Sequence, residues 1–236
     1  MLEQLKKELN GLRNDEQAKT LQKFFKTGKG EYAEGDIFLG IKVPIQRDIS
    51  KKYSNMDLKE IQELLNSKIH EHRFTALLIL IKKYQKSKKD RLERRKIFEF
   101  YLRNTQKVNN WDLVDLSAPI ILGDFLQKEG TDILFNMAQS ENMWERRIAI
   151  IATYPLIKKR RFGETLAISE ILLKDEQDLI HKAVGWMLRE IGKRNKKVLE
   201  LFLMQRHQKM PRVMLRYAIE KFPKEERTEW LKKVKE

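Results

Sequence analysis

Five apolar segments of similar pattern recur along the 236-residue chain, and this recurrence constrains the fold more than any other feature. The segments begin at Arg73, Trp111, Arg147, Lys182 and Arg212, with separations of 38, 36, 35 and 30 residues. Apolar residues at helical spacing indicate amphipathic helices, and a period of this size is typical of stacked helix pairs such as HEAT repeats. The pattern predicts an all-α, HEAT-like helical-repeat solenoid with a basic concave face, although a plain helical bundle can show similar recurrence.

Turn-forming residues are scarce, which supports the all-α prediction. The chain has 10 glycines and 5 prolines, whereas average usage would give about 17 and about 12. No segment alternates convincingly with a strand period. We expect one all-helical domain over residues 1–236, with its longest irregular stretch at residues 27–42 and one helix across residues 111–127.

The absence of cysteine excludes disulfides, cysteine zinc sites, iron–sulfur clusters and cysteine nucleophiles. None of the four histidines forms an i, i+4 metal-binding pair, and neither a Walker loop nor a GxGxxG motif is present. We therefore expect no metal and no cofactor, so that catalysis would use carboxylate, aromatic and basic groups. The sequence shows no membrane span and no signal-peptide core, which makes the cytoplasm the expected compartment.

The net charge of +15 favours a polyanionic partner, with nucleic acid first and an anionic membrane second. The excess is uneven: residues 1–100 carry +8 (23 basic, 15 acidic) and residues 141–236 carry +9 (23 basic, 14 acidic). Residues 101–140 carry −2 (3 basic, 5 acidic). This dip either reflects the small window or places a carboxylate within an otherwise phosphate-binding surface.

Trp111 and Asp115 are four residues apart on one predicted helix and therefore share a face. They could form a functional pair. Equally, Trp111 could anchor the core while Asp115 helps to cap the helix.

Trp186 lies one helical turn from Lys182 and one turn from Arg189. An aromatic ring flanked by two cations suits a groove that stacks on sugars or bases while binding phosphate. The alternative is an aromatic ring packed between repeats, with both cations solvated. The basic starts of the repeats, Arg147 and Arg212 among them, would form a basic track if the helix pairs stack as a solenoid.

Six stretches of the chain follow one another in the order of a known family's motifs: residues 38–47, 111–115, 144–149 and 182–190, and the closing segments 210–212 and 215–220. Together they resemble the AlkD-type bacterial DNA glycosylases, the HEAT-like-repeat DNA alkylation repair proteins. Each motif is moderately specific by itself, and the ordered set extends over most of the chain.

The resemblance implies a C-shaped, all-helical solenoid that holds duplex DNA in its concave face. It also implies excision of purines alkylated at N3 or N7, such as 3-methyladenine and 7-methylguanine, from duplex DNA without base flipping. It assigns catalytic roles to Asp115, the essential carboxylate, and to Trp111 and Trp186, which contact the deoxyribose of the lesion. Arg147 matches an arginine beside that carboxylate and the DNA backbone, and Lys182, Arg189 and Arg212 are expected to bind DNA. We expect a monomer whose partner is duplex DNA and not a membrane.

Two other functions are compatible with the residue patterns alone. A non-catalytic helical-repeat module would bind nucleic acid with steep salt dependence but release no base. A protein-interaction scaffold would show little DNA affinity at moderate salt. The joint presence of Trp111, Asp115 and Trp186 favours the glycosylase.

Overall fold

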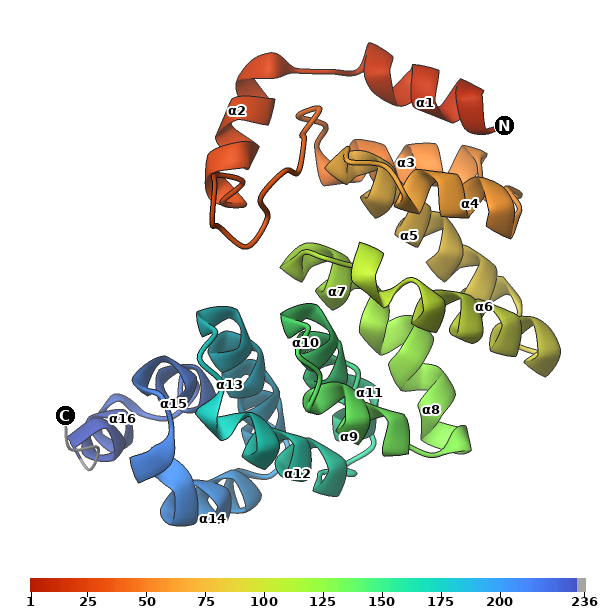
Figure 1. Ribbon diagram of the computed structural model, residues 1–236. Coiled ribbons are helices and arrows are strands. Elements are labelled where there is room, and N and C mark those ends of the chain that lie inside the picture. The colour runs from red at the N-terminus through yellow and green to blue at the C-terminus, as the bar shows by residue number, and fades with distance from the viewer. Residues whose placement is uncertain (233–236) are drawn as a thin grey trace. The chain divides into compact units, whose positions relative to one another are not determined.

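A computed structural model describes residues 1–232 and divides into two compact units, a first of residues 1–117 and a second that begins at residue 118 (Figure 1). Helices dominate both units, and the described residues contain no β-strand beyond a single bridge between Ile37 and Ile69. The all-α prediction is therefore confirmed. Within residues 1–232, no helix has the length and apolar character needed to cross a membrane. The single-domain expectation for residues 1–236 stays a prediction.

The first unit is built around a long buried helix, α5. Its helices are α1 (Leu2–Gly11), α2 (Asp15–Phe24), α3 (Val43–Lys52), α4 (Leu58–Leu65), α5 (His70–Lys86), α6 (Arg91–Arg103) and α7 (Trp111–Ala118, whose last residue falls in the second unit). Helices α3, α4 and α6 pack on α5, whose residues from His70 to Ile81 are all buried. Side-chain caps fix several helix starts, among them the Asp57 carboxylate, which accepts from the N–H of Glu60 at the start of α4.

The irregular stretch predicted at residues 27–42 is confirmed as the long connection between α2 and α3 (Figure 1). Backbone hydrogen bonds attach it to the start of α5: the N–H of Ile37 donates to the carbonyl of Lys68 at 3.0 Å, and the N–H of His70 donates to the carbonyl of Ile37 at 2.8 Å. This connection therefore has a defined path and brings its side chains to the first turn of α5.

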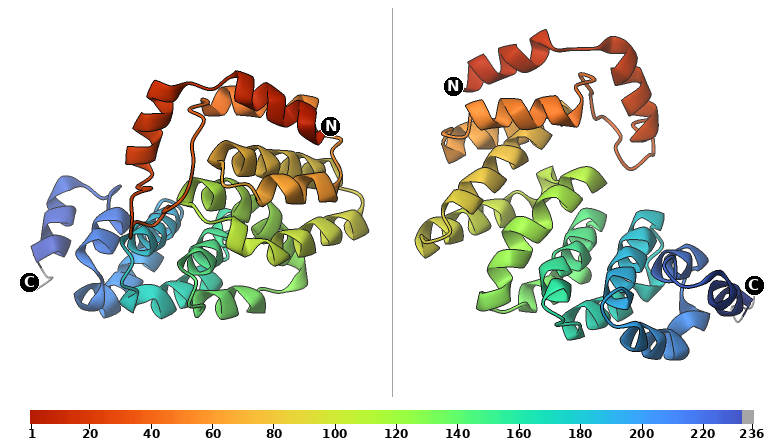
Figure 2. Two further views of the ribbon diagram at one scale, coloured as in Figure 1. Left: turned by 45° about the horizontal axis from the view of Figure 1, so that its top comes forward. Right: turned by 180° about the vertical axis from the view of Figure 1, so that it is seen from behind.

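The second unit is a stack of helices (Figure 2). Its helices are α8 (Asp124–Glu129), α9 (Asp132–Ala138), α10 (Met143–Ile151), α11 (Tyr154–Lys158), α12 (Gly163–Ile171), α13 (Asp178–Gly192), α14 (Lys196–Arg206), α15 (Arg212–Ala218) and α16 (Lys224–Lys232). Helix α13 packs against α10, α14 and α15. Helix α13 approaches α15 closely at Gly185, where a Cβ atom would lie 2.5 Å from the carbonyl oxygen of Met214.

The expected continuous α-helix over residues 111–127 is wrong in detail. Helix α7 ends at Ala118, a π-helical turn (η2) covers Pro119–Gly123, and α8 follows. Proline has no N–H, so residue 119 cannot donate to the carbonyl of Asp115, as the α-helical pattern requires. A π turn accommodates this missing bond, and such turns are frequent near functional residues.

Candidate functional site

In the first unit, Trp111 is the outer member of a stack of aromatic rings. The Trp111 ring lies parallel to that of Phe25, with centroids 5.2 Å apart, and Phe25 lies on Phe38 at 5.0 Å. Phe38 in turn stacks on the imidazole of His70 at 4.5 Å. Phe24 meets Trp111 edge-on at 6.0 Å. Phe25 and Phe38 are buried and Trp111 is half-buried, so the stack connects the core to the start of α7.

Asp115 follows Trp111 by one turn of α7 and is also half-buried. The spacing of four residues places the two side chains on one face of the helix, as the sequence predicts. Near the end of the same helix, the hydroxyl of Ser117 lies 2.9 Å from the buried hydroxyl of Tyr101. Burial raises the pKa of Tyr101, and the Asp115 carboxylate adds to that rise. The negative charge of Asp115 therefore acts on the interior of the unit as well as at its surface.

A buried charge network adjoins the first turn of α7. Asp112, the second residue of α7, has one carboxylate oxygen 2.8 Å from Nε2 of His70. On the other side of the ring, Nδ1 of His70 lies 3.5 Å from the Asp36 carboxylate, which also pairs with Arg73 at 2.6 Å. Burial alone would lower the pKa of His70, but Asp112 and Asp36 outweigh it and raise this pKa from 6.5 to about 8.

The Glu71 carboxylate of α5 holds the connection that carries Asp36 and Phe38. Glu71, 1% exposed, accepts hydrogen bonds from the backbone N–H groups of Leu39, Gly40 and Ile41 at 2.9, 2.8 and 3.2 Å. Gly40 has a φ of +83° and lies so close to α2 that a Cβ atom would be 2.2 Å from the carbonyl oxygen of Asn14. This local packing explains the glycine and fixes the position of the Phe38 ring.

In the second unit, α13 carries three of the predicted site residues. Trp186 is half-buried, and its ring centroid lies 6.4 Å from that of Tyr154 on α11. Cations from two other positions face the Tyr154 ring, with Lys158 Nζ 4.6 Å and the Arg194 guanidinium carbon 5.9 Å from its centroid. Trp186 thus belongs to a small aromatic group that is bordered by positive charge, an arrangement suited to stacking and phosphate binding.

The predicted basic residues occupy different environments. Arg147 on α10 is buried, 5% exposed, and donates to the carbonyl of Leu179 in the first turn of α13. Lys182 pairs with Asp178 at 2.5 Å, and Arg189 pairs with Glu220. Arg212 is exposed at the start of α15, where its guanidinium lies 3.4 Å from the carbonyl of Leu231. Arg147 therefore holds α13 in place, while Arg212 is open to solvent.

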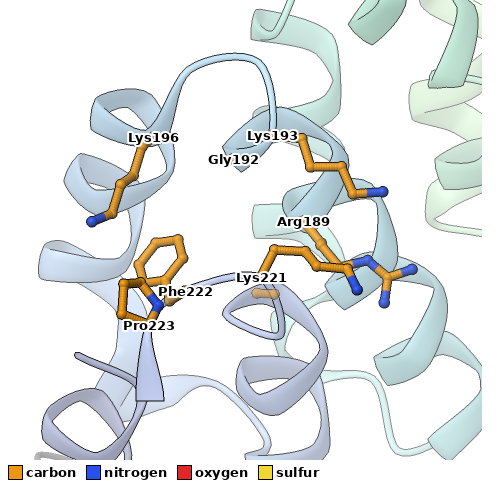
Figure 3. A pocket seen from close by; sticks show the side chains of 8 residues that line it. Arg189, Gly192, Lys193, Lys196, Lys221, Phe222 and Pro223 are labelled. Atoms are coloured by element: carbon orange, nitrogen blue, oxygen red, sulfur yellow. The ribbon is translucent and has the colours of Figure 1, made fainter. Parts of the chain in front are cut away.

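Arg189 also lines a basic pocket of about 300 Å³ (Figure 3). The lining consists of Arg189, Gly192, Lys193, Lys196, Ala218, Lys221, Phe222 and Pro223. Its four cations pair with glutamates: Lys193 with Glu190 and Lys196 with Glu226, both at 2.5 Å, and Lys221 with Glu220 at 3.0 Å, the carboxylate that Arg189 also binds. The glutamates partly neutralise the positive charge of the pocket, so an anion that entered it would have to compete with them.

The structure therefore groups the predicted residues within each unit. In the first unit, Trp111 and Asp115 lie together on α7. In the second unit, α13 carries Lys182, Trp186 and Arg189. Arg147 of α10 contacts the first turn of α13, and Arg212 lies on the neighbouring α15. Sequence reasoning missed Phe25, Phe38, His70 and Tyr154, which adjoin these residues. The local signals were the adjacent Phe24-Phe25 pair and the place of Phe38 at the start of the 38–47 motif, whereas the contacts of His70 and Tyr154 depend on how distant segments pack.

Comparison with solved structures establishes the class of fold. A predicted DNA alkylation repair enzyme from Enterococcus faecalis is 21% identical, with a TM-score of 0.69 over 90% of this chain and 97% of that chain. The smu.31 protein from Streptococcus mutans is 19% identical, with a TM-score of 0.56 over 75% of this chain and 90% of that one. AlkD2 from Streptococcus mutans is also 19% identical, with a TM-score of 0.56 over 89% and 99%. At these identities the likeness shows a shared helical-repeat fold.

The sequence itself identifies the family. Residues 5–222 match the family model described as DNA alkylation repair enzyme. Since the match covers most of the chain, the protein belongs to the family of DNA alkylation repair enzymes, as its motifs suggested. No curated protein matches the sequence significantly.

Proposed function

We propose that the protein is a DNA glycosylase that excises positively charged N3- or N7-alkylated purines, of the 3-methyladenine and 7-methylguanine type, from duplex DNA. The observation that carries the proposal is the pairing of Trp111 with Asp115 on one half-buried face of α7. The aromatic stack behind Trp111 braces this ring. Membership of the alkylation repair family supplies the class of substrate.

The chemistry requires few groups because the alkylated base is cationic and already a good leaving group. Its departure leaves an oxocarbenium-like sugar, which a nearby negative charge stabilises. Asp115 supplies this charge and orients the attacking water. The faces of Trp111 and Trp186 are electron-rich and favour a cationic sugar by about 0.5–2 kcal/mol each when desolvated. In this mechanism the protein acts at the sugar and backbone, so the base need not flip into a pocket.

The basic residues of the second unit would bind the DNA backbone. Arg189, Lys182 and Arg212 present cations on α13 and α15, and the chain carries a net charge of +15. Arg147, which is buried against α13, would act chiefly by holding that helix and Trp186 in place. Binding of this kind weakens steeply with salt because it releases counterions from the duplex. We expect the protein to act as a monomer.

The decisive experiment measures release of free 3-methyladenine and 7-methylguanine from alkylated duplex DNA by the wild type and by Asp115→Asn. Loss of the carboxylate charge should slow release by about a hundredfold or more. Glu99→Gln removes an exposed carboxylate of α6 in the same unit and should release base like the wild type. A wild-type protein that binds duplex DNA but releases neither base would instead be the non-catalytic nucleic-acid-binding module.

A second measurement tests whether Trp111 and Trp186 act on the same lesion. The rates of Trp111→Ala, Trp186→Ala and the double variant form a double-mutant cycle, and residues that share a transition state give effects that do not add. Additive losses would mean that the two tryptophans serve separate sites.

A further inference from the structure

The imidazole of His70 is enclosed at the point where three segments of the first unit meet. It is the first residue of α5, is 3% exposed, and stacks on Phe38 from the long connection at 4.5 Å. Phe25, the residue that follows α2, lies 5.2 Å from the same ring. A histidine so deeply buried that also faces two carboxylates is costly unless the charges balance, so its surroundings require an explanation.

The charged groups that face His70 come from three elements. Asp36 belongs to the connection before α3, Arg73 to α5 itself and Asp112 to α7, whereas the end of α2 contributes only the uncharged Phe25 that follows it. The two carboxylate contacts differ. Nε2 makes a hydrogen bond of 2.8 Å to Asp112, while Nδ1 lies 3.5 Å from Asp36 and has no hydrogen-bond geometry. The stronger link from His70 therefore runs to α7.

Asp112 transmits this link to the first turn of α7. One of its carboxylate oxygens accepts from His70 and the other accepts from the backbone N–H of Leu113 at 2.8 Å. Asp112 lies between Trp111, which precedes it, and Asp115, which follows by three residues. A shift of this carboxylate would therefore move the segment that carries both proposed catalytic side chains.

We infer that His70 is a positioning residue for base release: through Asp112 it fixes the start of α7 and thereby the Trp111 ring and the Asp115 carboxylate. This inference rests on the proposed glycosylase function for its catalytic consequence. The protonated imidazole donates from both nitrogens, whereas the neutral ring donates from one and presents a lone pair from the other. Above the pKa of His70, about 8, the neutral ring can keep its Nε2–H on Asp112, but the contact loses the attraction between opposite charges, so the restraint on the start of α7 weakens.

Two substitutions at this position separate the two contacts. His70→Gln places an amide NH₂ near the position of Nε2, where it can donate to Asp112 at any pH. His70→Asn places its NH₂ near the position of Nδ1, toward Asp36, and leaves Asp112 without its donor. Both variants remove the same charge and ring, so a difference between them reports on the contact with Asp112.

The test measures single-turnover release of 7-methylguanine at saturating DNA between pH 6 and 9, together with the dissociation constant for DNA. We expect His70→Asn to slow release about tenfold with unchanged DNA affinity, and His70→Gln to stay within about threefold of the wild type. The wild-type rate should fall through pH 8 more steeply than that of His70→Gln. Equal rates in the two variants, or a change in DNA affinity alone, would overturn the inference.

A spectroscopic measurement keeps this inference separate from the proposed function. In protein labelled with 5-fluorotryptophan, the ¹⁹F resonance of Trp111, assigned from Trp111→Phe, should titrate near pH 8 in the wild type and in neither His70 variant. A titrating resonance without any base release would refute the glycosylase but retain the coupling of His70 to α7. A resonance that does not change with pH would refute the coupling itself. Should both His70 variants fail to fold, Asp112→Ala removes the acceptor of the same contact and must slow release at least as much as expected for His70→Asn.

Discussion

The indole ring of Trp111 lies nearly parallel to the phenyl ring of Phe25, with centroids 5.2 Å apart and planes inclined by 13°. Phe25 rests on Phe38, so the stack extends from the core of the first unit to the half-buried start of α7. A ring that is already held on one face loses little further conformational entropy when a ligand contacts its remaining surface. Core packing and a functional role for Trp111 are therefore compatible, although the sequence presents them as alternatives.

The stack predicts different outcomes for two adjacent phenylalanines. Phe25→Ala removes a buried ring between Trp111 and Phe38 and should lower the free energy of unfolding by about 3–5 kcal/mol. Phe24→Ala removes a ring that is 62% exposed and should lower it by less than about 1 kcal/mol. Urea unfolding followed by circular dichroism measures both values. Equal losses in the two variants would contradict the burial pattern.

The Glu71 carboxylate should be one of the most sensitive side chains of the first unit. Glu71→Ala leaves the buried N–H groups of Leu39, Gly40 and Ile41 without their acceptor, at a cost of about 3 kcal/mol or more. Amide hydrogen exchange at Gly40 should accelerate by a larger factor than exchange within α3. Glu63→Ala, an exposed carboxylate of α4, serves as the control and should change neither quantity. Unchanged exchange at Gly40 in Glu71→Ala would mean that other contacts hold the connection.

The raised pKa of His70 makes stability depend on pH in a defined direction. Since the folded-state pKa of about 8 exceeds the unfolded value of about 6.5, the contribution is fully present below pH 6.5 and is lost as the pH rises through 8. The shift corresponds to about 2 kcal/mol. Free energies of unfolding measured at pH 6 and pH 9 should therefore differ by about that much more in the wild type than in His70→Gln. Parallel pH profiles would show that His70 does not titrate in this window.

Gly185 should tolerate no side chain, because α13 and α15 touch at that residue. A Cβ atom there would lie 2.5 Å from both the carbonyl oxygen of Met214 and the Cβ of Tyr217. Gly185→Ala should therefore lower the unfolding free energy of the second unit by about 1–3 kcal/mol and shift the fluorescence of the adjacent Trp186. Gly163→Ala, where no atom lies within 4 Å of the added carbon, should leave both unchanged. A Gly185→Ala protein as stable as the wild type would show that the two helices can separate without cost.

Helical periodicity and the scarcity of glycine and proline were sufficient to predict an all-α fold, because both features are local. The i, i+4 spacing likewise placed Trp111 and Asp115 on one face, since helix geometry alone decides it. The π turn at Pro119 was missed because hydrophobic periodicity does not register a single absent N–H. The contacts of His70 with Asp36 and Asp112 join residues 34 and 42 positions apart, and no local pattern predicts such pairs.

The burial of Arg147 is a second feature that a local sequence pattern does not predict. Its motif predicted a DNA contact, but nothing in the motif could show that the guanidinium is 5% exposed and bound to the carbonyl of Leu179. Burial depends on where α10 meets α13, which is a tertiary property. The DNA-binding roles of Arg147, Lys182, Arg189 and Arg212 stay predictions, and the two arginines at opposite extremes of burial offer the sharpest test.

Arg147→Ala and Arg212→Ala should affect different quantities. Loss of the buried Arg147 leaves the Leu179 carbonyl without this donor and should lower the free energy of unfolding by about 2–3 kcal/mol. Loss of the exposed Arg212 should change stability by less than about 0.5 kcal/mol. If Arg212 neutralises one phosphate, however, the slope of log affinity against log salt should become shallower by about 0.9. Chemical denaturation and DNA binding at several salt concentrations measure both effects. If Arg147→Ala kept full stability and only lost salt-dependent affinity, Arg147 would contact DNA directly, which would require its guanidinium to leave the carbonyl of Leu179.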